Sequence, residues 1–325
     1  MKSSLIRLRM IQRIISEIMQ NGSFLVAAHE NPDGDAVGSS LALACYLSAL
    51  GKDVTVFSCD PLPENYLFLP MADSVVTAIP DRNFDICFVL DAGDLSRTGG
   101  DPDRFRKMGK IINIDHHPDN KAFGDINLLD PQASATGALV YRLIAASGFS
   151  IDYSTALCIY TAIVTDTGSF RYSNADHEAF QISGQMVLHG INPWYVAEKL
   201  YESQPRQRLE LLGLALSTLH LTARGDIASI TVTLEMYDKT GATPELTDGF
   251  INYPRSIGGV EVAVFFREIE KGLFKVSFRS KGKVDVSALS AAFGGGGHRN
   301  AAGCRIKGSL DEAKQRVLSH IEKAF

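Results

Sequence analysis

The chain has 325 residues, of which 45% are hydrophobic and 21% are charged, and its formal net charge at pH 7 is −5. This composition is typical of a soluble globular protein and excludes a largely disordered chain, while the length predicts two domains. The negative charge excludes a strongly basic surface for long nucleic acid, although it permits a short nucleotide held by metals and a few arginines.

The basic side chains within residues 1–20 raise the question of a targeting segment. Ile11, Ile14, Ile15 and Ile18 instead follow a helical stripe, which predicts an amphipathic helix packed on the domain. No run approaches the ~20 apolar residues of a membrane span. The five cysteines are odd in number and never form a CxxC pair, which indicates buried thiols in a reducing compartment. We therefore expect a cytoplasmic protein.

Short apolar strands alternate with helical patterns in the first half of the chain. The predicted strands are Phe24–Ala28, Val54–Phe57, Ile86–Leu90 and Ile111–Ile114, and a helix over Ala36–Leu50 follows the first. This rhythm predicts an α/β fold, with a mostly parallel sheet and helices on both faces. In such sheets, ligands bind at the carboxyl ends of the strands.

The second half begins with helical patterns over Ala135–Tyr201 and a predicted long connecting helix over Glu202–Leu221. The sequence pattern then changes and predicts a smaller α+β domain. Its predicted elements are strands over Ile227–Leu234, Val260–Phe266 and Phe274–Phe278, a hairpin turn at Glu270-Lys271-Gly272, and helices over Val286–Phe293 and Leu310–Ala324. We expect a first domain over 1–190, a helical linker over 191–220 and a second domain over 221–325.

Imidazoles and carboxylates recur where apolar segments end. Six such side chains are candidate metal ligands: His29, Asp33, Asp35, Asp91, His116 and Asp166. Asp166 is expected to end a buried helix, and an N-cap of the helix that follows Asp35 is the structural alternative for the first aspartates. Four converging carboxylates would repel one another, whereas two divalent ions would neutralise them. The ligand types favour Mn²⁺ or Mg²⁺ over Zn²⁺ or Co²⁺, and we expect Mn²⁺. Two ions roughly 3.5–4 Å apart could activate a bridging water and stabilise the leaving oxygen of a phosphoester.

Two further side chains flank His116. Asp115 is expected to fix a histidine tautomer, and His117 to contact the scissile phosphate or to protonate the leaving oxygen. Surface polar sequence is the alternative for the doubled histidine. Four other histidines have no such context and are predicted to be structural or exposed: His177, His189, His220 and His320.

A glycine run, Gly294–Gly297, marks the second domain. It could be a flexible linker, but its backbone N–H groups also suit a phosphate or carboxylate of a substrate. Arg279, at the end of a predicted strand, could fork onto a phosphate or be a solvated charge. The candidate substrate contacts are Arg279, Ser280, Gly295, Gly296, Gly297, His298 and Arg299, with Arg255 and Arg267 as weaker candidates. Arg206 and Arg208 are expected on an exposed helix face.

These stretches resemble a known family. Four segments are similar, in order and character, to the four motifs of the DHH phosphoesterase superfamily, which is named for its Asp-His-His triplet. These segments are AAHENPDGDAVGSS, FVLDAGD, NIDHHPDN and TAIVTDTGSFRYSN. The segment SFRSKGKVDVSALSAAFGGGGHRNAAG resembles the DHH-associated substrate domain of that superfamily. The resemblance covers nearly the whole chain. It implies a catalytic domain over 1–190 and a substrate-binding domain over 221–325.

The resemblance also implies a ligand set and a function. One ion would be held by His29, Asp33 and Asp91, and the other by Asp35, Asp91, His116 and Asp166, with Asp91 bridging. The short two-domain form with a GGGGH motif is most similar to the nanoRNase and pAp phosphatase group. Those enzymes trim mononucleotides from very short RNA and remove the 3′-phosphate from 3′-phosphoadenosine 5′-phosphate. A water activated by the metals is expected to attack phosphorus.

Three other functions stay open at this point. A phosphodiesterase for cyclic or linear dinucleotides would have the same metal ligands. A manganese pyrophosphatase is disfavoured because its second domain lacks the GGGGH motif. The intact ligand set argues against a non-catalytic nucleotide-binding regulator. We expect a short RNA or small nucleotide as the substrate, neither a membrane nor long duplex nucleic acid as a partner, and leave a homodimer open.

Overall fold

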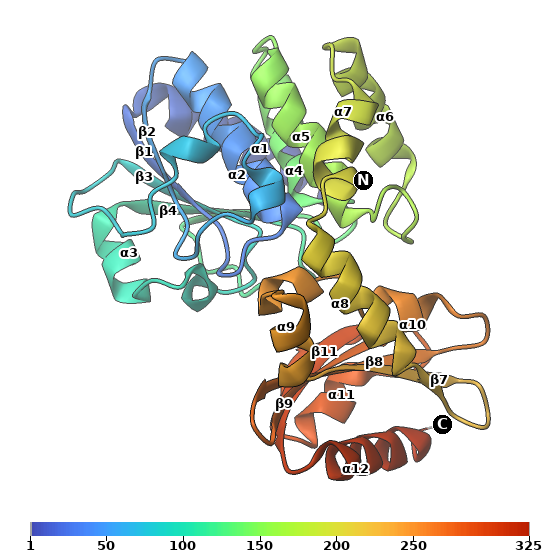
Figure 1. Ribbon diagram of the computed structural model, residues 1–325. Coiled ribbons are helices and arrows are strands. Elements are labelled where there is room, and N and C mark those ends of the chain that lie inside the picture. The colour runs from blue at the N-terminus through green and yellow to red at the C-terminus, as the bar shows by residue number, and fades with distance from the viewer. Residues whose placement is uncertain (1, 325) are drawn as a thin grey trace. The chain divides into compact units, whose positions relative to one another are not determined.

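The computed structural model describes residues 2–324, and the chain divides into two compact units, Met1–Ser203 and Gln204–Phe325 (Figure 1). The division falls inside the segment 191–220 that the sequence marks as a linker. In that segment α7 (Pro193–Ala197) belongs to the first unit, and α8 (Arg206–Ser217) belongs to the second.

The first unit is built on a five-stranded parallel sheet with the strand order β2-β1-β3-β4-β5. Its strands are β1 (Ser23–Ala27), β2 (Asp53–Phe57), β3 (Ile86–Leu90), β4 (Lys110–Asp115) and β5 (Ile126–Leu129). The first four match the predicted strands. Strand β5 was not predicted, because a four-residue segment becomes recognisable only when it pairs with β4 at the edge of the sheet.

Helices cover both faces of this sheet, as the α/β prediction requires. They are α1 (Lys2–Gln20), α2 (Gly34–Ala49), α3 (Pro102–Met108), α4 (Thr136–Ala146), α5 (Tyr153–Asp166), α6 (His177–Leu188) and α7. On one face Phe24 and Phe88 join the core formed with α1, α2, α4 and α5. On the other face Leu25 and Val89 pack with Phe105 of α3. Alternate residues of each strand therefore serve opposite cores.

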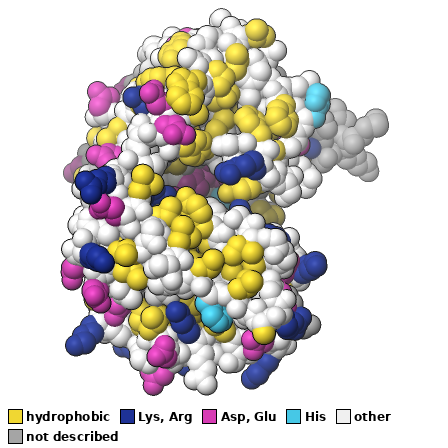
Figure 2. Space-filling view, turned by 45° about the vertical axis from the view of Figure 1, so that its right-hand side comes forward, with side chains coloured by type: hydrophobic (Ala, Val, Ile, Leu, Met, Phe, Trp, Pro, Cys, Tyr) yellow, Lys and Arg dark blue, Asp and Glu magenta, His cyan; other side chains and the backbone are white. Residues whose placement is uncertain are grey.

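The predicted amphipathic helix near the N-terminus is α1. Its stripe of Ile11, Ile14 and Ile18 is buried in the larger core of the first unit. None of the helices in the described part of the chain has the length and apolar character that crossing a bilayer requires. On the face drawn in Figure 2, basic and acidic side chains are interspersed. This face therefore shows no extended patch of side chains with the same charge.

The second unit contains a six-stranded mixed sheet with the order β10-β11-β9-β8-β7-β6. Its strands are β6 (His220–Leu221), β7 (Ile227–Val232), β8 (Val262–Glu270), β9 (Leu273–Ser280), β10 (Gly296–His298) and β11 (Ala301–Lys307). Helices α11 (Val286–Ala291) and α12 (Leu310–Glu322) pack on one face. Helices α8, α9 (Leu234–Thr240) and α10 (Asn252–Ser256) lie beside β7 and β8, whose other face they cover. The smaller α+β unit and its β8–β9 hairpin are confirmed.

Four 3₁₀ turns and one π-helical turn complete the structure of the described residues. They are η1 (Glu64–Tyr66), η2 (Ala72–Ser74), η3 (Leu95–Thr98), η4 (Glu198–Glu202, the π turn) and η5 (Pro244–Thr247).

The long helix predicted over Glu202–Leu221 is wrong at both ends. Helix α8 begins only at Arg206, because Pro205 precedes it in an extended conformation and proline favours such a boundary. After Ser217 the chain turns into the short strand β6. The prediction that Arg208 lies on an exposed helix face is also wrong. Its guanidinium donates to the carbonyl oxygens of Leu246 and Asp248, and it lies over the ring of Phe250.

Candidate metal centre

The six predicted ligands come together at the carboxyl ends of neighbouring strands. His29 follows β1, Asp91 directly follows β3 and His116 directly follows β4, and these three strands are adjacent in the order β1-β3-β4. Asp35 lies in the first turn of α2, and Asp166 is the last residue of α5, the buried helix that the sequence predicts.

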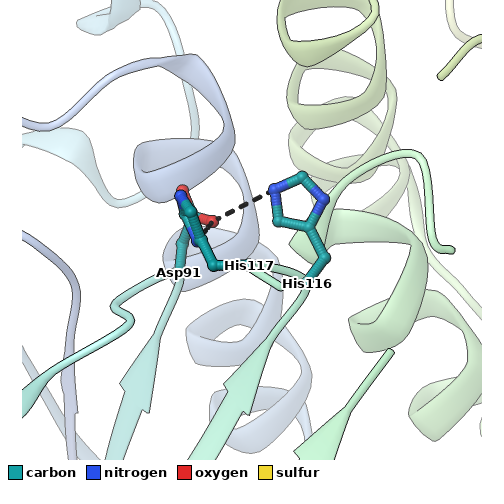
Figure 3. A group of neighbouring side chains, drawn as sticks. All are labelled: Asp91, His116 and His117. Carbon is teal, nitrogen blue, oxygen red and sulfur yellow. Dashed lines mark ion pairs between the residues drawn. The ribbon is translucent and has the colours of Figure 1, made fainter. Parts of the chain in front are cut away.

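Asp91 stands at the middle of this group. Its Oδ2 atom lies 3.6 Å from Nε2 of His29, which is also 3.8 Å from Oδ1 of Asp33. Its Oδ1 atom lies 3.6 Å from Nε2 of His116 (Figure 3). The two carboxylate oxygens of Asp91 therefore face two different histidines.

The second half of the group surrounds His116. Its Nε2 atom is 3.8 Å from Oδ2 of Asp35 and 3.8 Å from Oδ2 of Asp166. The six predicted ligands thus fall into two sets, His29–Asp33–Asp91 and Asp35–His116–Asp166. A third group, Asp91–His116–His117, places His117 beside them (Figure 3), and within each group the donor atoms lie within 4.8 Å of one another.

The donor set fits divalent cations. The separations of 3.6 and 3.8 Å between imidazole and carboxylate atoms are too long for hydrogen bonds. They leave room for an ion about 2.0–2.2 Å from each donor. Among the described residues, no lysine or arginine forms an ion pair with any of these aspartates. The group can therefore hold divalent metal.

The electrostatics of the bare site point the same way. Burial, together with Asp91 and Asp166, raises the pKa of the Asp35 carboxyl well above its usual range. Burial raises the pKa of Asp166 to about 7, with Asp91 adding to the shift and His116 opposing it. Burial lowers the pKa of His29, but Asp33 and Asp91 outweigh it and raise the value to about 10. Protons on these groups would be exchanged for cations on metal binding.

Backbone carbonyls set the orientation of both histidines. Nδ1 of His29 is 2.7 Å from the carbonyl oxygen of Glu30, and Nδ1 of His116 is 3.2 Å from that of Ala133. An imidazole that donates its Nδ1–H to a carbonyl carries its lone pair on Nε2. In both residues Nε2 is the atom that faces the carboxylates.

The first aspartates divide two tasks between them. Asp33, and not Asp35, is the N-cap of α2, because its Oδ1 atom accepts from the backbone N–H groups of Asp35 and Ala36. Asp35 instead accepts from the N–H groups of Thr136 and Gly137, at 2.6 and 2.9 Å. The N-terminus of α4 therefore fixes the Asp35 carboxylate.

Two side chains that position predicted ligands were not predicted from the sequence. The hydroxyl of Thr136 donates to Oδ1 of Asp91 at 3.0 Å. The amide of Asn174 donates to Oδ2 of Asp166 at 3.0 Å and to the carbonyl of Ser134 at 2.9 Å. Asn174 closes the segment TAIVTDTGSFRYSN, so its motif offered a signal. Thr136 lies 45 residues from Asp91, and no local pattern links them.

We expect Thr136→Val to lower kcat/KM by about 10–100-fold, the usual cost of losing a group that orients a metal ligand. Valine keeps the shape of the buried side chain but cannot donate to Asp91. Steady-state kinetics at saturating metal measures the loss. Thr136→Ser retains the hydroxyl and should restore most of the activity. An equal loss in both variants would contradict the role of the hydroxyl.

Asp115 and His117 form a pair beside the six ligands. Nδ1 of His117 is 2.7 Å from Oδ1 of Asp115, which is fully buried. Oδ2 of Asp115 accepts from the amide of Asn120 at 2.6 Å. Nδ1 of His117 also lies 3.6 Å from Oδ1 of Asp91, so the pair reaches the metal ligands. Burial lowers the pKa of His117, but Asp115 and Asp91 outweigh it and raise the value to about 9.

The predicted substrate contacts all lie in the second unit. Arg279 is on β9, paired with Ala263 and Ala301 of the neighbouring strands. Ser280 is buried, and its hydroxyl donates to Glu261 at 3.2 Å. Arg299 is exposed. The side chain of His298 lies outside what the structure describes.

The glycine run is ordered as part of the sheet and is not a flexible linker. Gly296 and Gly297 belong to β10, the edge strand, and pair with Gly303 and Ala302 of β11. A Cβ atom on Gly295 would lie 2.3 Å from the carbonyl oxygen of Gly303, so only glycine fits this close approach. The backbone of the run is therefore held at the sheet edge.

Comparison with known families identifies the class. The N-terminal domain of the DHH family matches residues 23–163, and the DHHA1 domain matches residues 227–325. The chain belongs to the DHH phosphoesterase family, as its motifs predict.

Individual relatives match over nearly the full length. The Thermus thermophilus protein named "Bifunctional oligoribonuclease and PAP phosphatase NrnA" is 34% identical over 315 residues, which cover 96% of this chain and 93% of the relative. The Bacillus subtilis protein of the same name is 27% identical over 312 residues, covering 95% of this chain and 96% of the relative. The crystal structure of an exopolyphosphatase-related protein from Bacteroides fragilis has a TM-score of 0.92 and 31% identity, covering 97% of this chain and 96% of that one.

Proposed function

We propose that this chain hydrolyses very short oligoribonucleotides to mononucleotides and removes the 3′-phosphate from 3′-phosphoadenosine 5′-phosphate. The observation that carries the proposal is Asp91, whose two carboxylate oxygens face His29 and His116 separately. That arrangement suits a pair of cations acting on one phosphate. The names of the Thermus thermophilus and Bacillus subtilis relatives support the choice of substrates.

The residues would divide the work as follows. His29, Asp33 and Asp91 would hold one cation, and Asp35, Asp91, His116 and Asp166 the other. Oxygen and imidazole donors without thiolate suit Mn²⁺, with Mg²⁺ or Co²⁺ as substitutes. When bound, the two cations supply Lewis-acid charge to the phosphate and activate water for attack on phosphorus.

The side chains around the ligands would then handle orientation and protons. Asp115 holds the His117 ring through Nδ1, and His117 would contact the phosphate or protonate the leaving oxygen. In the second unit, Arg279, His298 and Arg299, with the backbone of Gly295–Gly297 and with Ser280, would bind the remainder of the substrate. Arginine suits this task because its planar fork matches a phosphate.

We expect Mn²⁺ to raise the melting temperature of EDTA-treated protein in a concentration-dependent way. Ligand binding to the folded state alone stabilises by about 2.7 kcal/mol for each site at a ligand concentration one hundred times Kd. Differential scanning calorimetry measures this without any substrate. Magnesium and cobalt serve as comparison ions. A melting temperature that none of the three ions changes would contradict the metal centre.

A substrate panel at saturating Mn²⁺ tests the activity itself. It contains dinucleotide RNA, a pentanucleotide, a long oligomer, 3′-phosphoadenosine 5′-phosphate, cyclic di-AMP and pyrophosphate. We expect turnover of the short RNAs and of the bisphosphate nucleotide, with the long oligomer much slower. Preferred hydrolysis of cyclic di-AMP or of pyrophosphate would replace the proposal with that activity. Binding without turnover of any member would favour a nucleotide-binding regulator.

A further inference from the structure

Three cations lie side by side across the sheet of the second unit. In the strand register, Lys275 of β9 pairs with Arg305 of β11 on one side and with Arg267 of β8 on the other. Directly paired residues point to the same face of a sheet. Arg267, Lys275 and Arg305 therefore form one row on the face opposite α11 and α12, and we call it the cation row.

The cation row has a cost that the fold alone does not explain. Like charges directly opposite one another on neighbouring strands destabilise a sheet. Basic side chains often protect the edge strands of sheets from unwanted pairing. Strands β8 and β9 are interior, whereas β10 pairs with β11 only from Ala301 to Gly303, so Arg305 lies on an open stretch of the sheet edge. Edge protection therefore accounts for Arg305 but not for Arg267 and Lys275, which lie on interior strands.

One carboxylate lies near the row, since Glu245 interacts electrostatically with Arg267, but it forms no ion pair with it. Among the described residues, no aspartate or glutamate forms an ion pair with any of its three members. Arg267 is held by the carbonyl of Pro244 and the hydroxyl of Thr247, while Lys275 and Arg305 are exposed. Desolvation of its ammonium group by the surrounding side chains lowers the pKa of Lys275, and the neighbouring Arg267, Arg305 and Arg279 lower it further. Two exposed cations beside a fixed one are suited to an external anion.

The cation row lies on the same face of the sheet as Arg279. Lys275 and Arg279 lie four residues apart on β9, so they share a face and are about 13 Å apart along the strand. Between them on that face lie Ser277 and, opposite it on β11, Gly303, so the path over β9 and β11 carries small residues. On the β8 side Ser277 pairs with Phe265, which is buried. Stacked nucleotides advance about 3.4 Å each. A strand that begins at Arg279 therefore reaches the row only after roughly two to four nucleotides.

We propose that the cation row binds the backbone phosphates of an oligoribonucleotide beyond the nucleotides held at Arg279. This inference rests on the proposed RNA substrate and deepens it. The row would favour oligomers of three or more nucleotides and contribute nothing to a dinucleotide or to 3′-phosphoadenosine 5′-phosphate. Glu245 provides negative charge to Arg267, and phosphates would provide it to Lys275 and Arg305.

The test uses Lys275→Gln/Arg305→Gln in the full-length protein. Fluorescence anisotropy with a labelled RNA pentanucleotide in EDTA measures binding without turnover. We expect Kd to rise about tenfold, roughly threefold for each lost contact. The slope of log K against log salt should fall in magnitude by about 1.4, or about 0.7 for each contact with a single strand. Dinucleotide binding should change less than twofold.

Two comparison variants separate this role from a structural one. Lys275→Glu places a carboxylate between Arg267 and Arg305, so it should raise the melting temperature while weakening pentanucleotide binding further. Arg316→Ala/Lys323→Ala removes the same charges from exposed positions on and just after α12, which packs on the opposite face, and should leave Kd within twofold.

The outcomes distinguish this inference from the proposed function. An unchanged pentanucleotide Kd in Lys275→Gln/Arg305→Gln, or an equal loss for the dinucleotide, would overturn the cation row as a binding site. Neither result would alter metal-dependent turnover of a dinucleotide, on which the proposed function depends. Conversely, if the wild-type protein hydrolysed no RNA, the anisotropy comparison would still decide whether the row binds it.

Discussion

Asp91→Asn is expected to lower turnover by about 10³-fold or more, because it weakens the one ligand that both cations would share. A metal pair supplies several kcal/mol of transition-state stabilisation, and an amide oxygen offers no charge to either ion. Asparagine is the cleanest replacement. Asp91 has a left-handed backbone with φ of 55°, which asparagine tolerates better than alanine, and it can still accept from Thr136.

The same variant has a readout independent of activity. Removing the Asp91 charge relieves its repulsion of Asp35 and Asp166 but also loses its attraction to His29 and His117. The metal-free melting temperature should therefore change little, while the rise on adding Mn²⁺ should shrink. His29 belongs to only one of the two ligand sets, so His29→Ala should lower turnover less than Asp91→Asn. Asp103→Asn, an exposed carboxylate on α3, is the matched control. Near-normal turnover of Asp91→Asn at saturating Mn²⁺ would rule out a bridging role.

The parallel sheet could be predicted because its strands are nearly continuous apolar runs that end in polar residues. Ile86–Leu90 is buried throughout, and the pattern alone gives its limits. Because the carboxyl ends of parallel strands meet at one edge of the sheet, the same pattern predicts from the sequence alone that His29, Asp91 and His116 lie close together. The ligand positions thus follow from strand ends and local spacing.

The supporting contacts could not be predicted in the same way. Thr136 and Gly137 reach Asp35 across 101 and 102 residues of chain, and their role depends on how α4 packs against α2. The cation row is similar, since it exists only in the pairing of β8, β9 and β11. Long-range register is a property of the folded sheet, so sequence spacing does not reveal it.

His117→Ala is expected to lower kcat on RNA by about 10²–10⁴-fold, the usual contribution of a positioned general acid, while metal content stays near that of the wild type. The reason is geometric. The His117 ring atom that lies near the ligands is Nδ1, 3.6 Å from Oδ1 of Asp91, whereas His29 and His116 present Nε2 to the carboxylates. Because Asp115 already engages that Nδ1 at 2.7 Å, we infer that His117 acts on the substrate and not as a ligand. Inductively coupled plasma mass spectrometry measures the metal content beside steady-state kinetics.

The leaving group provides the decisive comparison for His117. An RNA 3′-oxygen needs a proton as it departs, whereas p-nitrophenolate leaves readily without one, so bis-p-nitrophenyl phosphate should be hydrolysed by His117→Ala almost as well as by the wild type. Asp115→Asn should show a weaker form of the same selectivity, because it disturbs the orientation of the ring. His177→Ala, an exposed histidine at the start of α6, should match the wild type on both substrates. Loss of one metal in His117→Ala, with parallel loss on both substrates, would instead make His117 a ligand.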